Sequence, residues 1–136
     1  MLCMIGREID AGSLESLATL ARNAGATRIL EIGTGSGDVT LALAAVLPAD
    51  GLLITMEADA AAATAARQRF SAAGAGQQIS VIVGEPSRFL HKIRGPFDVI
   101  VRRVPDEAGA LRERVAPLLR PGGILIDATR NIVSRT

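Results

Sequence analysis

A loop of alternating glycines and hydroxyl residues is the part of this sequence best suited to ligand chemistry. It follows an aliphatic run, and its members are Gly33, Thr34, Gly35, Ser36 and Gly37. Glycine has no Cβ, so the N–H groups of such a loop can approach a ligand closely, and a helical pattern begins directly behind it. Glu31 adds a carboxylate at the loop entrance. This junction of strand, loop and helix predicts a binding site for a nucleotide-like cofactor.

Two further carboxylates, Glu57 and Glu85, stand at the ends of other aliphatic runs. If these runs are parallel strands, their carboxyl ends meet at one edge of a sheet, beside the glycine loop. There Glu57 can accept both ribose hydroxyls of an adenosine, and Glu85 with its neighbouring N–H groups can meet an adenine edge. Alternatively, both are surface acids ahead of a helix N-terminus.

The spacing of the glycines bears on the identity of the cofactor. Dinucleotide-binding loops follow the pattern G-x-G-x-x-G. This loop reads G-x-G-x-G and places Asp38 where the third glycine belongs, so a carboxylate would repel a pyrophosphate there. Glu31 suits a cationic group such as the ammonium of an amino acid. Together these features favour S-adenosylmethionine, with S-adenosylhomocysteine as the product, over NAD.

Strand and helix patterns alternate along the whole chain, and this alternation positions the acids and glycines. Aliphatic runs predict strands at residues 28–32, 52–56, 79–83, 97–101 and 124–126. Strands separated by helices imply a parallel sheet covered on both faces, and right-handed crossovers make it doubly wound. We therefore predict an α/β fold, a Rossmann-like doubly wound parallel sheet whose strands take the order 3-2-1-4-5. Residues 129–136 can add at most one short strand.

The intervening helices carry their own start and stop signals. Asp10 can cap the first helix, and Asp59 can cap an alanine-rich one. The helix behind the glycine loop is expected to reach Leu47. The last helical pattern extends to Leu119, and Pro117 within it predicts a kink or a new start.

The composition is that of a single globular domain. The 136 residues are 49% hydrophobic and carry a net charge of +1, so we treat residues 1–136 as one domain. No run of about 18 apolar residues is present, which predicts no membrane span. The single cysteine, Cys3, and the absence of a signal-peptide layout suit a reducing cytoplasm.

The two halves of the chain differ in charge. Residues 1–68 contain four basic and eight acidic side chains, whereas residues 69–136 contain eleven basic and six acidic ones. Solvated helix faces explain this difference, and so does an anionic substrate or an oppositely charged partner. No basic run is present and three phenylalanines are the only aromatic residues, which argues against nucleic-acid binding.

Over these motifs the sequence resembles the class I S-adenosylmethionine-dependent methyltransferases, and more narrowly the small O-methyltransferases of the catechol and caffeoyl-CoA type. The segments that carry the resemblance are residues 23–28, 29–37, 47–51, 56–59, 83–85, 95–100 and 118–123. The resemblance implies a set of cofactor-binding residues comprising Glu31, Gly33, Thr34, Gly35, Ser36, Gly37, Glu57, Ala58, Glu85 and Pro86, with Met4 and Ile5 near the methionine part. Within this set, Glu57 is implied to bind the ribose.

The sequence departs from that family at the positions of its metal site. Family members follow the fourth strand with an aspartate that holds a divalent cation, and Arg103 stands there. An Asp-Asn pair follows their fifth strand, but here Ala128 and Thr129 occupy those positions and Asp127 comes one residue early. We therefore expect no metal. The family's N-terminal helices and its last two strands are also expected to be missing.

Arg103, or its neighbour Arg102, is our hypothesis for the group that replaces the cation. A guanidinium supplies fixed positive charge and can hold a carboxylate, phosphate or phenolate acceptor. The alternative is that both arginines point to solvent or to a partner chain. The small-molecule acceptor itself is not specified by the sequence.

Three interpretations of function stay open at this point. The chain is an active methyltransferase whose site is completed by a homodimer or a partner subunit, or it binds S-adenosylmethionine without catalysis. A third interpretation, an NAD-binding oxidoreductase, is disfavoured by Asp38. A homodimer is expected because the strand at 124–126 would otherwise be a bare edge.

Overall fold

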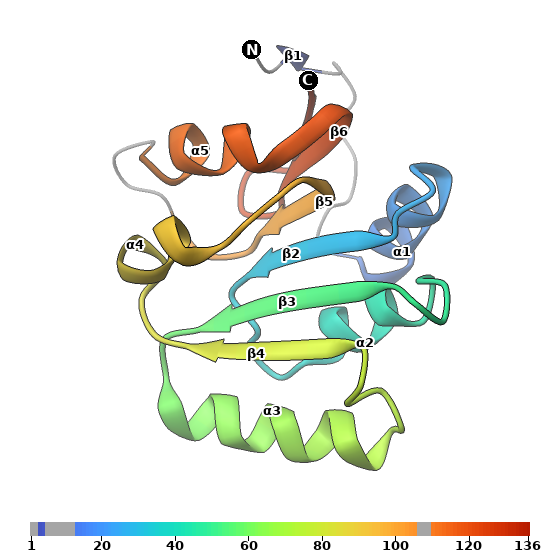
Figure 1. Ribbon diagram of the computed structural model, residues 1–136, viewed down its shortest axis with the longest axis vertical. Coiled ribbons are helices and arrows are strands. Elements are labelled where there is room, and N and C mark those ends of the chain that lie inside the picture. Colours follow the sequence, from blue (N-terminus) through green and yellow to red (C-terminus); the bar gives the residue numbers. More distant parts are fainter. Residues whose placement is uncertain (1–2, 5–12, 106–109) are drawn as a thin grey trace.

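The computed structural model describes residues 3–4, 13–105 and 110–136. Within these residues the strands form one sheet in the order β1-β7-β6-β5-β2-β3-β4 (Figure 1). The strands are β1 (Cys3–Met4), β2 (Arg28–Ile32), β3 (Leu52–Glu57), β4 (Ile79–Val83), β5 (Phe97–Arg102), β6 (Leu119–Asp127) and β7 (Ile132–Arg135). Strands β2 to β6 pair in parallel, whereas β7 pairs antiparallel with β6, and β1 with β7.

The predicted α/β fold and strand order are confirmed by this sheet. The five strands expected from the sequence lie in the order β4-β3-β2-β5-β6. The additional strand β7 comes from residues 129–136, as the prediction allowed. It covers β6, so the expectation that this edge is bare was wrong. A homodimer stays a prediction, but the argument from an unpaired edge no longer supports it.

The helices cover both faces of the sheet, and each face has its own apolar core. They are α1 (Leu14–Asn23), α2 (Asp38–Ala44), α3 (Ala60–Ala72), α4 (Pro86–Phe89) and α5 (Ala110–Val115). Leu17, Leu43 and Phe70, from α1, α2 and α3, pack in the core of one face. Val115 of α5 packs in the core of the other face. Alternate side chains of a strand point to opposite faces of the sheet. Leu30 and Ile32 of β2 belong to the core on the α5 side, so Glu31, between them in the sequence, points to the α2 side.

Two helix boundaries differ from those expected. The N-cap of α1 is Ser13, whose hydroxyl accepts a hydrogen bond from the Ser16 N–H at 3.4 Å. The prediction for Asp10 as its cap was therefore wrong, and Asp10 itself lies outside the described residues. Helix α2 ends at Ala44 rather than reaching Leu47. Asp59 does cap α3, since its carboxylate accepts the N–H of Ala61 at 2.9 Å.

The approach to β6 confirms one prediction and corrects another. Helix α5 ends at Val115, and a 3-10 turn containing Pro117 follows, as expected for a residue that lacks an N–H. Leu119 belongs to β6 and not to the helix. The strand is longer than expected because its register with β5 shifts: Phe97 pairs with Leu119, but Val99 pairs with Ile124. Among the described residues no helix is long and apolar enough to cross a membrane.

Candidate functional site

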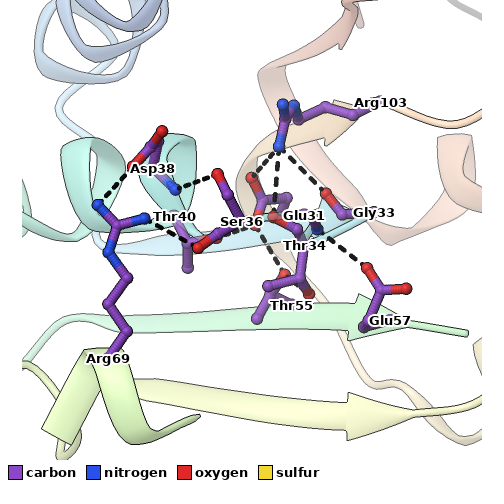
Figure 2. Close-up of polar contacts among 11 residues, drawn as sticks. Glu31, Gly33, Thr34, Ser36, Asp38, Thr40, Thr55, Glu57, Arg69 and Arg103 are labelled. Atoms are coloured by element: carbon purple, nitrogen blue, oxygen red, sulfur yellow. Dashed lines mark hydrogen bonds and ion pairs between the residues drawn. The ribbon is translucent and has the colours of Figure 1, made fainter. Parts of the chain in front are cut away.

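The glycine loop joins β2 to α2 and lies at the carboxyl edge of the sheet (Figure 2). It is anchored to the next strand, because the N–H of Gly33 donates to the Met56 carbonyl at 2.9 Å. Gly33 has φ +101° and Gly37 has φ +89°, values that favour glycine. A Cβ at Gly37 would lie 2.7 Å from a ring carbon of the buried Phe70, so a side chain there would force the ring or the loop to shift.

Glu31 is fully buried beneath this loop. Its Oε1 accepts hydrogen bonds from the hydroxyls of Thr40 at 2.5 Å and Thr55 at 2.7 Å. Its Oε2 has no hydrogen-bond partner among the described residues. Burial raises the pKa of Glu31 to about 7, against the opposing effect of the two threonines and of Arg103. The fold therefore holds a carboxylate with one oxygen unsatisfied next to the loop.

Glu57 ends β3 and is held by two backbone N–H groups. Its Oε1 accepts from Gly35 at 2.9 Å and its Oε2 from Asp59 at 3.0 Å. Each oxygen has a second lone pair, so the carboxylate can accept further hydrogen bonds from a ligand in the same fixed orientation. A carboxylate held in this way has free lone pairs on both oxygens for two neighbouring hydroxyl groups.

A cleft of about 610 Å³ opens beside these groups. Several residues of the predicted cofactor set line it, namely Gly33, Glu57, Ala58, Glu85 and Pro86. Further lining residues that sequence reasoning did not find are Ser87, Val104, Leu111 and Arg114. The sequence contains a reason to expect some of them, because a segment that follows the carboxyl end of a parallel strand, as the start of α5 follows β5, lies at the ligand-binding edge of the sheet.

The hydroxyl residues of the loop have different surroundings. Thr34 is buried, and its hydroxyl lies 2.7 Å from that of Thr55. Ser36 is exposed, and its carbonyl accepts from Nη1 of Arg69 at 2.9 Å. Arg69 also pairs with Asp38 at 2.5 Å, and its hydrogen bond and positive charge lower the pKa of that carboxyl. The negative charge in the place of a third glycine is thus balanced by an arginine of α3.

Arg102 ends β5 inside the protein. Its guanidinium pairs with the carboxylate of Asp127, and the two side chains are only 6% and 7% exposed. Nη1 also donates to the Val104 carbonyl at 2.5 Å, and Nη2 to the Thr129 hydroxyl at 3.3 Å. Asp127 and Arg102 are partners in the register of β5 and β6, which explains why they meet.

Arg103 turns back over the glycine loop (Figure 2). Its Nη1 lies 3.4 Å from the carbonyl oxygens of both Gly33 and Thr34. The same nitrogen is 3.8 Å from the unsatisfied Oε2 of Glu31. The two adjacent arginines therefore differ: Arg102 is enclosed at β6, whereas Arg103 lies over the predicted cofactor site.

The residues that the structure describes at the ends of β5 and β6, up to Pro105 and from Ala110 onward, do not fit a divalent cation. Such an ion is held by several oxygen ligands, among them at least one or two free carboxylates. The carboxylate found there in the described part of the chain, Asp127, is already paired with Arg102. Within the described ranges no group of three or more His, Cys, Asp and Glu side chains could hold a metal.

Met4 and Ile5 were predicted to lie near the cofactor, and Thr55 was not predicted but contacts Glu31. Met4 lies in β1, where it pairs with Ser134, and β7, β6 and β5 separate this strand from β2. Its predicted proximity to the methionine part of the cofactor stays a prediction. Ile5 lies outside the described residues. Thr55 was missed by sequence reasoning, although it is the register partner of Glu31 on the adjacent strand.

The chain matches a known protein family over most of its length. The O-methyltransferase family profile matches residues 5–130. The chain is 37% identical over 123 residues to an arginine N(omega)-methyltransferase of Streptomyces achromogenes subsp. streptozoticus, covering 82% of this chain and 33% of that protein. It is 35% identical over 115 residues to the catechol O-methyltransferase domain-containing protein 1 of Mus musculus, covering 80% and 44%. It thus spans less than half of these curated relatives.

Solved structures share the fold. The O-methyltransferase TomG from Streptomyces achromogenes, solved in complex with SAM, aligns with a TM-score of 0.80 and 31% identity over 86% of this chain and 55% of that one. An O-methyltransferase from Bacillus cereus in complex with SAH aligns with a TM-score of 0.78 and 29% identity over 88% and 57%. Fold and site thus define an S-adenosylmethionine-dependent methyltransferase core. The chain belongs to the class I S-adenosylmethionine-dependent O-methyltransferase family. This membership decides against the dinucleotide-dependent oxidoreductase.

Proposed function

We propose that this chain transfers a methyl group from S-adenosylmethionine to an oxygen of a small anionic acceptor without a metal ion. The observation that carries this proposal is the arrangement at the ends of β5 and β6. Guanidinium groups stand where a cation-dependent enzyme needs carboxylates, and the carboxylate of Asp127 is occupied by Arg102. Positive charge for the acceptor then comes from the protein itself.

The residues at the glycine loop fit the cofactor. The oriented carboxylate of Glu57 can take the ribose diol, and Glu85 and Pro86 line the part of the cleft where the adenine would lie. The unsatisfied Oε2 of Glu31 faces the loop and suits the ammonium group. These contacts support the cofactor-binding set proposed from the sequence, including Gly33, Thr34, Gly35, Ser36 and Gly37.

Bound S-adenosylmethionine would supply an electrophilic methyl group, so the protein has only to position and activate the acceptor. Val104, Pro105 and Leu111 give the cleft an apolar wall. Arg114 also lines the cleft, with its Nη1 held by the Ser87 carbonyl at 2.8 Å. Arg103 and Arg114 can then hold an anionic oxygen, while the buried pair with Asp127 makes Arg102 a group that fixes the strand ends.

The alternative is a chain that binds the cofactor without catalysis or requires another subunit. The observation in its favour is coverage, because the chain spans 55% of TomG and smaller shares of the curated relatives. A homodimer or a partner chain could complete the acceptor side of the cleft. Light scattering of the purified chain would show whether it is a dimer.

Turnover measurements separate these possibilities. Transfer of a labelled methyl group to a panel of phenols and carboxylates should occur, and EDTA or added Mg²⁺ should change kcat/KM by less than about twofold. Arg103→Ala should lower kcat by about a hundredfold, as expected for the loss of a charged group that contacts the reacting oxygen. Arg94→Ala, on the exposed connection into β5 at the opposite edge, is the matched control and should leave turnover unchanged.

Two outcomes would contradict the proposal. A strict requirement for a divalent cation would place a metal where we infer none. Binding of S-adenosylhomocysteine without turnover of any acceptor, by a chain shown to be folded, would favour the non-catalytic alternative.

A further inference from the structure

The Arg103 guanidinium makes its contacts with groups that also suit a ligand cation. Two backbone carbonyls of the loop and one carboxylate oxygen surround its Nη1, at 3.4 Å from Gly33, 3.4 Å from Thr34 and 3.8 Å from Glu31 (Figure 2). Three acceptors converging on one point form a subsite for a small cation with several N–H donors. An ammonium group has that shape and charge.

The same subsite contains an oxygen that the protein leaves unsatisfied. Both threonine donors to Glu31 bind Oε1, so Oε2 receives no hydrogen bond from the described residues. The side chain is fully buried, and a buried carboxylate oxygen without a donor is costly. The distance from Arg103 to Oε2 exceeds that of a hydrogen bond, so the guanidinium balances the charge of Glu31 without satisfying this oxygen.

Arg103 is held firmly by its backbone and loosely by its side chain. Its N–H donates to the Ile32 carbonyl at 2.9 Å, which continues the pairing of β5 with β2. The 3.4 Å contacts of Nη1 are longer than typical hydrogen bonds, which cluster near about 2.9 Å. The side chain is 31% exposed, and the next residues, Val104 and Pro105, line the cleft. The guanidinium can therefore leave the loop while the strand stays in place.

We propose that, in the free protein, the Arg103 guanidinium occupies the subsite that Glu31 and the glycine loop provide for the ammonium group of the cofactor, which must displace it. Two cations cannot share acceptors at this spacing, because like charges repel at short range. Arg103 thus lowers the affinity for the cofactor and moves toward the cleft when the cofactor binds. This rests on the proposed function in that the ligand is S-adenosylmethionine or its product.

Displacement of Arg103 would link cofactor binding to acceptor binding. In the free chain Arg103 faces the loop, and after displacement its charge becomes available to an anionic acceptor beside Val104 and Pro105. Cofactor binding would therefore precede acceptor binding. Arg103 would thus contact the glycine loop in the free chain and an anionic acceptor in the complex, which one fixed position of its side chain does not allow.

Calorimetry with two ligands tests the proposal on the whole chain. S-adenosylhomocysteine carries the ammonium group, whereas its deaminated analogue has hydrogen in that place and is otherwise the same. Arg103→Met, which keeps much of the side-chain volume, should bind S-adenosylhomocysteine about tenfold more tightly than the wild type, as expected if the subsite is open in about one free molecule in ten. The deaminated analogue should bind both proteins equally.

Arg69→Met is the matched control. Arg69 also contacts the loop, through the Ser36 carbonyl, but it lies on the α3 side and pairs with Asp38 rather than Glu31. Any change that it causes should be the same for both ligands. Arg103→Gln serves as the second variant should Arg103→Met fail to fold, with the same expectations.

Several results would overturn the proposal. Weaker binding of S-adenosylhomocysteine to Arg103→Met would mean that Arg103 attracts the carboxylate of the cofactor instead. An equal gain in affinity for both ligands would show that the guanidinium does not compete with the ammonium group. An absence of binding by every protein tested would show that the site does not take this ligand at all. Since the readout is binding, a chain without turnover can still confirm this inference while it refutes the proposed catalysis.

Discussion

The carboxyl edge of the sheet has two halves that differ in charge and in how completely their polar groups are satisfied. At the ends of β2, β3 and β4 stand carboxylates, Glu31, Glu57 and Glu85. At the ends of β5 and β6 stand Arg102, paired with Asp127, and Arg103. The first half leaves acceptor capacity open, most clearly at Oε2 of Glu31. In the second half, Arg102 and Asp127 pair with each other, and Val104 and Thr129 satisfy their remaining polar atoms.

Under the proposed function, the ends of β2, β3 and β4 form a cofactor half of this edge, and the ends of β5 and β6 form an acceptor half. The cofactor half is pre-organised, because backbone hydrogen bonds to Glu57 and the packing of Gly37 against Phe70 fix its shape before any ligand arrives. The acceptor half contains a buried ion pair, Arg102 with Asp127, and one long side chain, Arg103, that reaches across to the other half. Under the proposed function, specificity for the acceptor would therefore depend on Arg103 and on the lining of the cleft.

The largest change in unfolding free energy is expected from breaking the buried ion pair of the acceptor half. Arg102→Ala would leave Asp127 buried without its partner, and breaking a buried ion pair from one side typically costs about 3–5 kcal/mol of unfolding free energy. Urea unfolding at neutral pH measures the change. The double variant Arg102→Met with Asp127→Leu should regain most of the lost stability, since it removes both charges and deprives only the Thr129 N–H and hydroxyl of their acceptor.

The exposed pair of Arg69 and Asp38 in the cofactor half is the matched control. Its side chains are 46% and 52% exposed, so water screens both charges. Arg69→Ala should therefore change the unfolding free energy little. A loss as large as that of Arg102→Ala would show that burial does not distinguish the two halves.

In the cofactor half, the next largest effect is a dependence of stability on pH. The folded chain raises the pKa of Glu31 from 4.5 to about 7, so it holds a proton that the unfolded chain releases. The stability gained in this way is present below pH 4.5 and is lost as pH rises through about 7. From that shift, the loss amounts to about 3 kcal/mol.

Glu31→Gln isolates this contribution, because glutamine does not titrate. The unfolding free energy of the wild type minus that of the variant should fall between about pH 4.5 and about pH 8.5. Other titrating groups are common to both proteins and cancel in the difference. A constant difference over this range would mean that Glu31 is solvated or paired in solution, and the contrast between the two halves would lose its main support.

The cofactor half was largely predictable from the sequence, for local reasons. The aliphatic runs, the alternating glycines and the acids at strand ends are short-range patterns, and the strand order followed from the general handedness of crossovers. The strand at residues 28–32 has the predicted bounds. Glu57 and Glu85 line the cleft, as their positions at the carboxyl ends of β3 and β4 implied.

What the sequence could not show depends on contacts between distant segments. Arg103 faces Glu31 across about seventy positions of sequence, as its hydrogen bond to Gly33 illustrates. The pairing of Arg102 with Asp127 depends on the register of β5 and β6, and β6 itself is extended by a shift in that register. Local propensity placed Leu119 in a helix because pairing with Phe97 is not visible in a short window.

The smallest of these effects concerns the hydrogen bond from Thr40 to Glu31. Thr40→Val keeps the side-chain shape but removes the hydroxyl that donates to Oε1 at 2.5 Å. A hydrogen bond to a charged group contributes more than one to a neutral group, so the variant should lose about 1 kcal/mol more stability at about pH 8.5 than at about pH 5. Thr64→Val, an exposed threonine of α3, should show no such pH dependence.

The background variant Glu31→Gln decides whether this interpretation is correct. In that background no charge develops near residue 40, so Thr40→Val should cost the same at both pH values. If the cost still grows with pH there, Thr40 responds to another titrating group and not to Glu31. If it becomes constant, the donors on Oε1 stabilise the ionised carboxylate, and Oε2 is the oxygen of Glu31 left for a ligand cation.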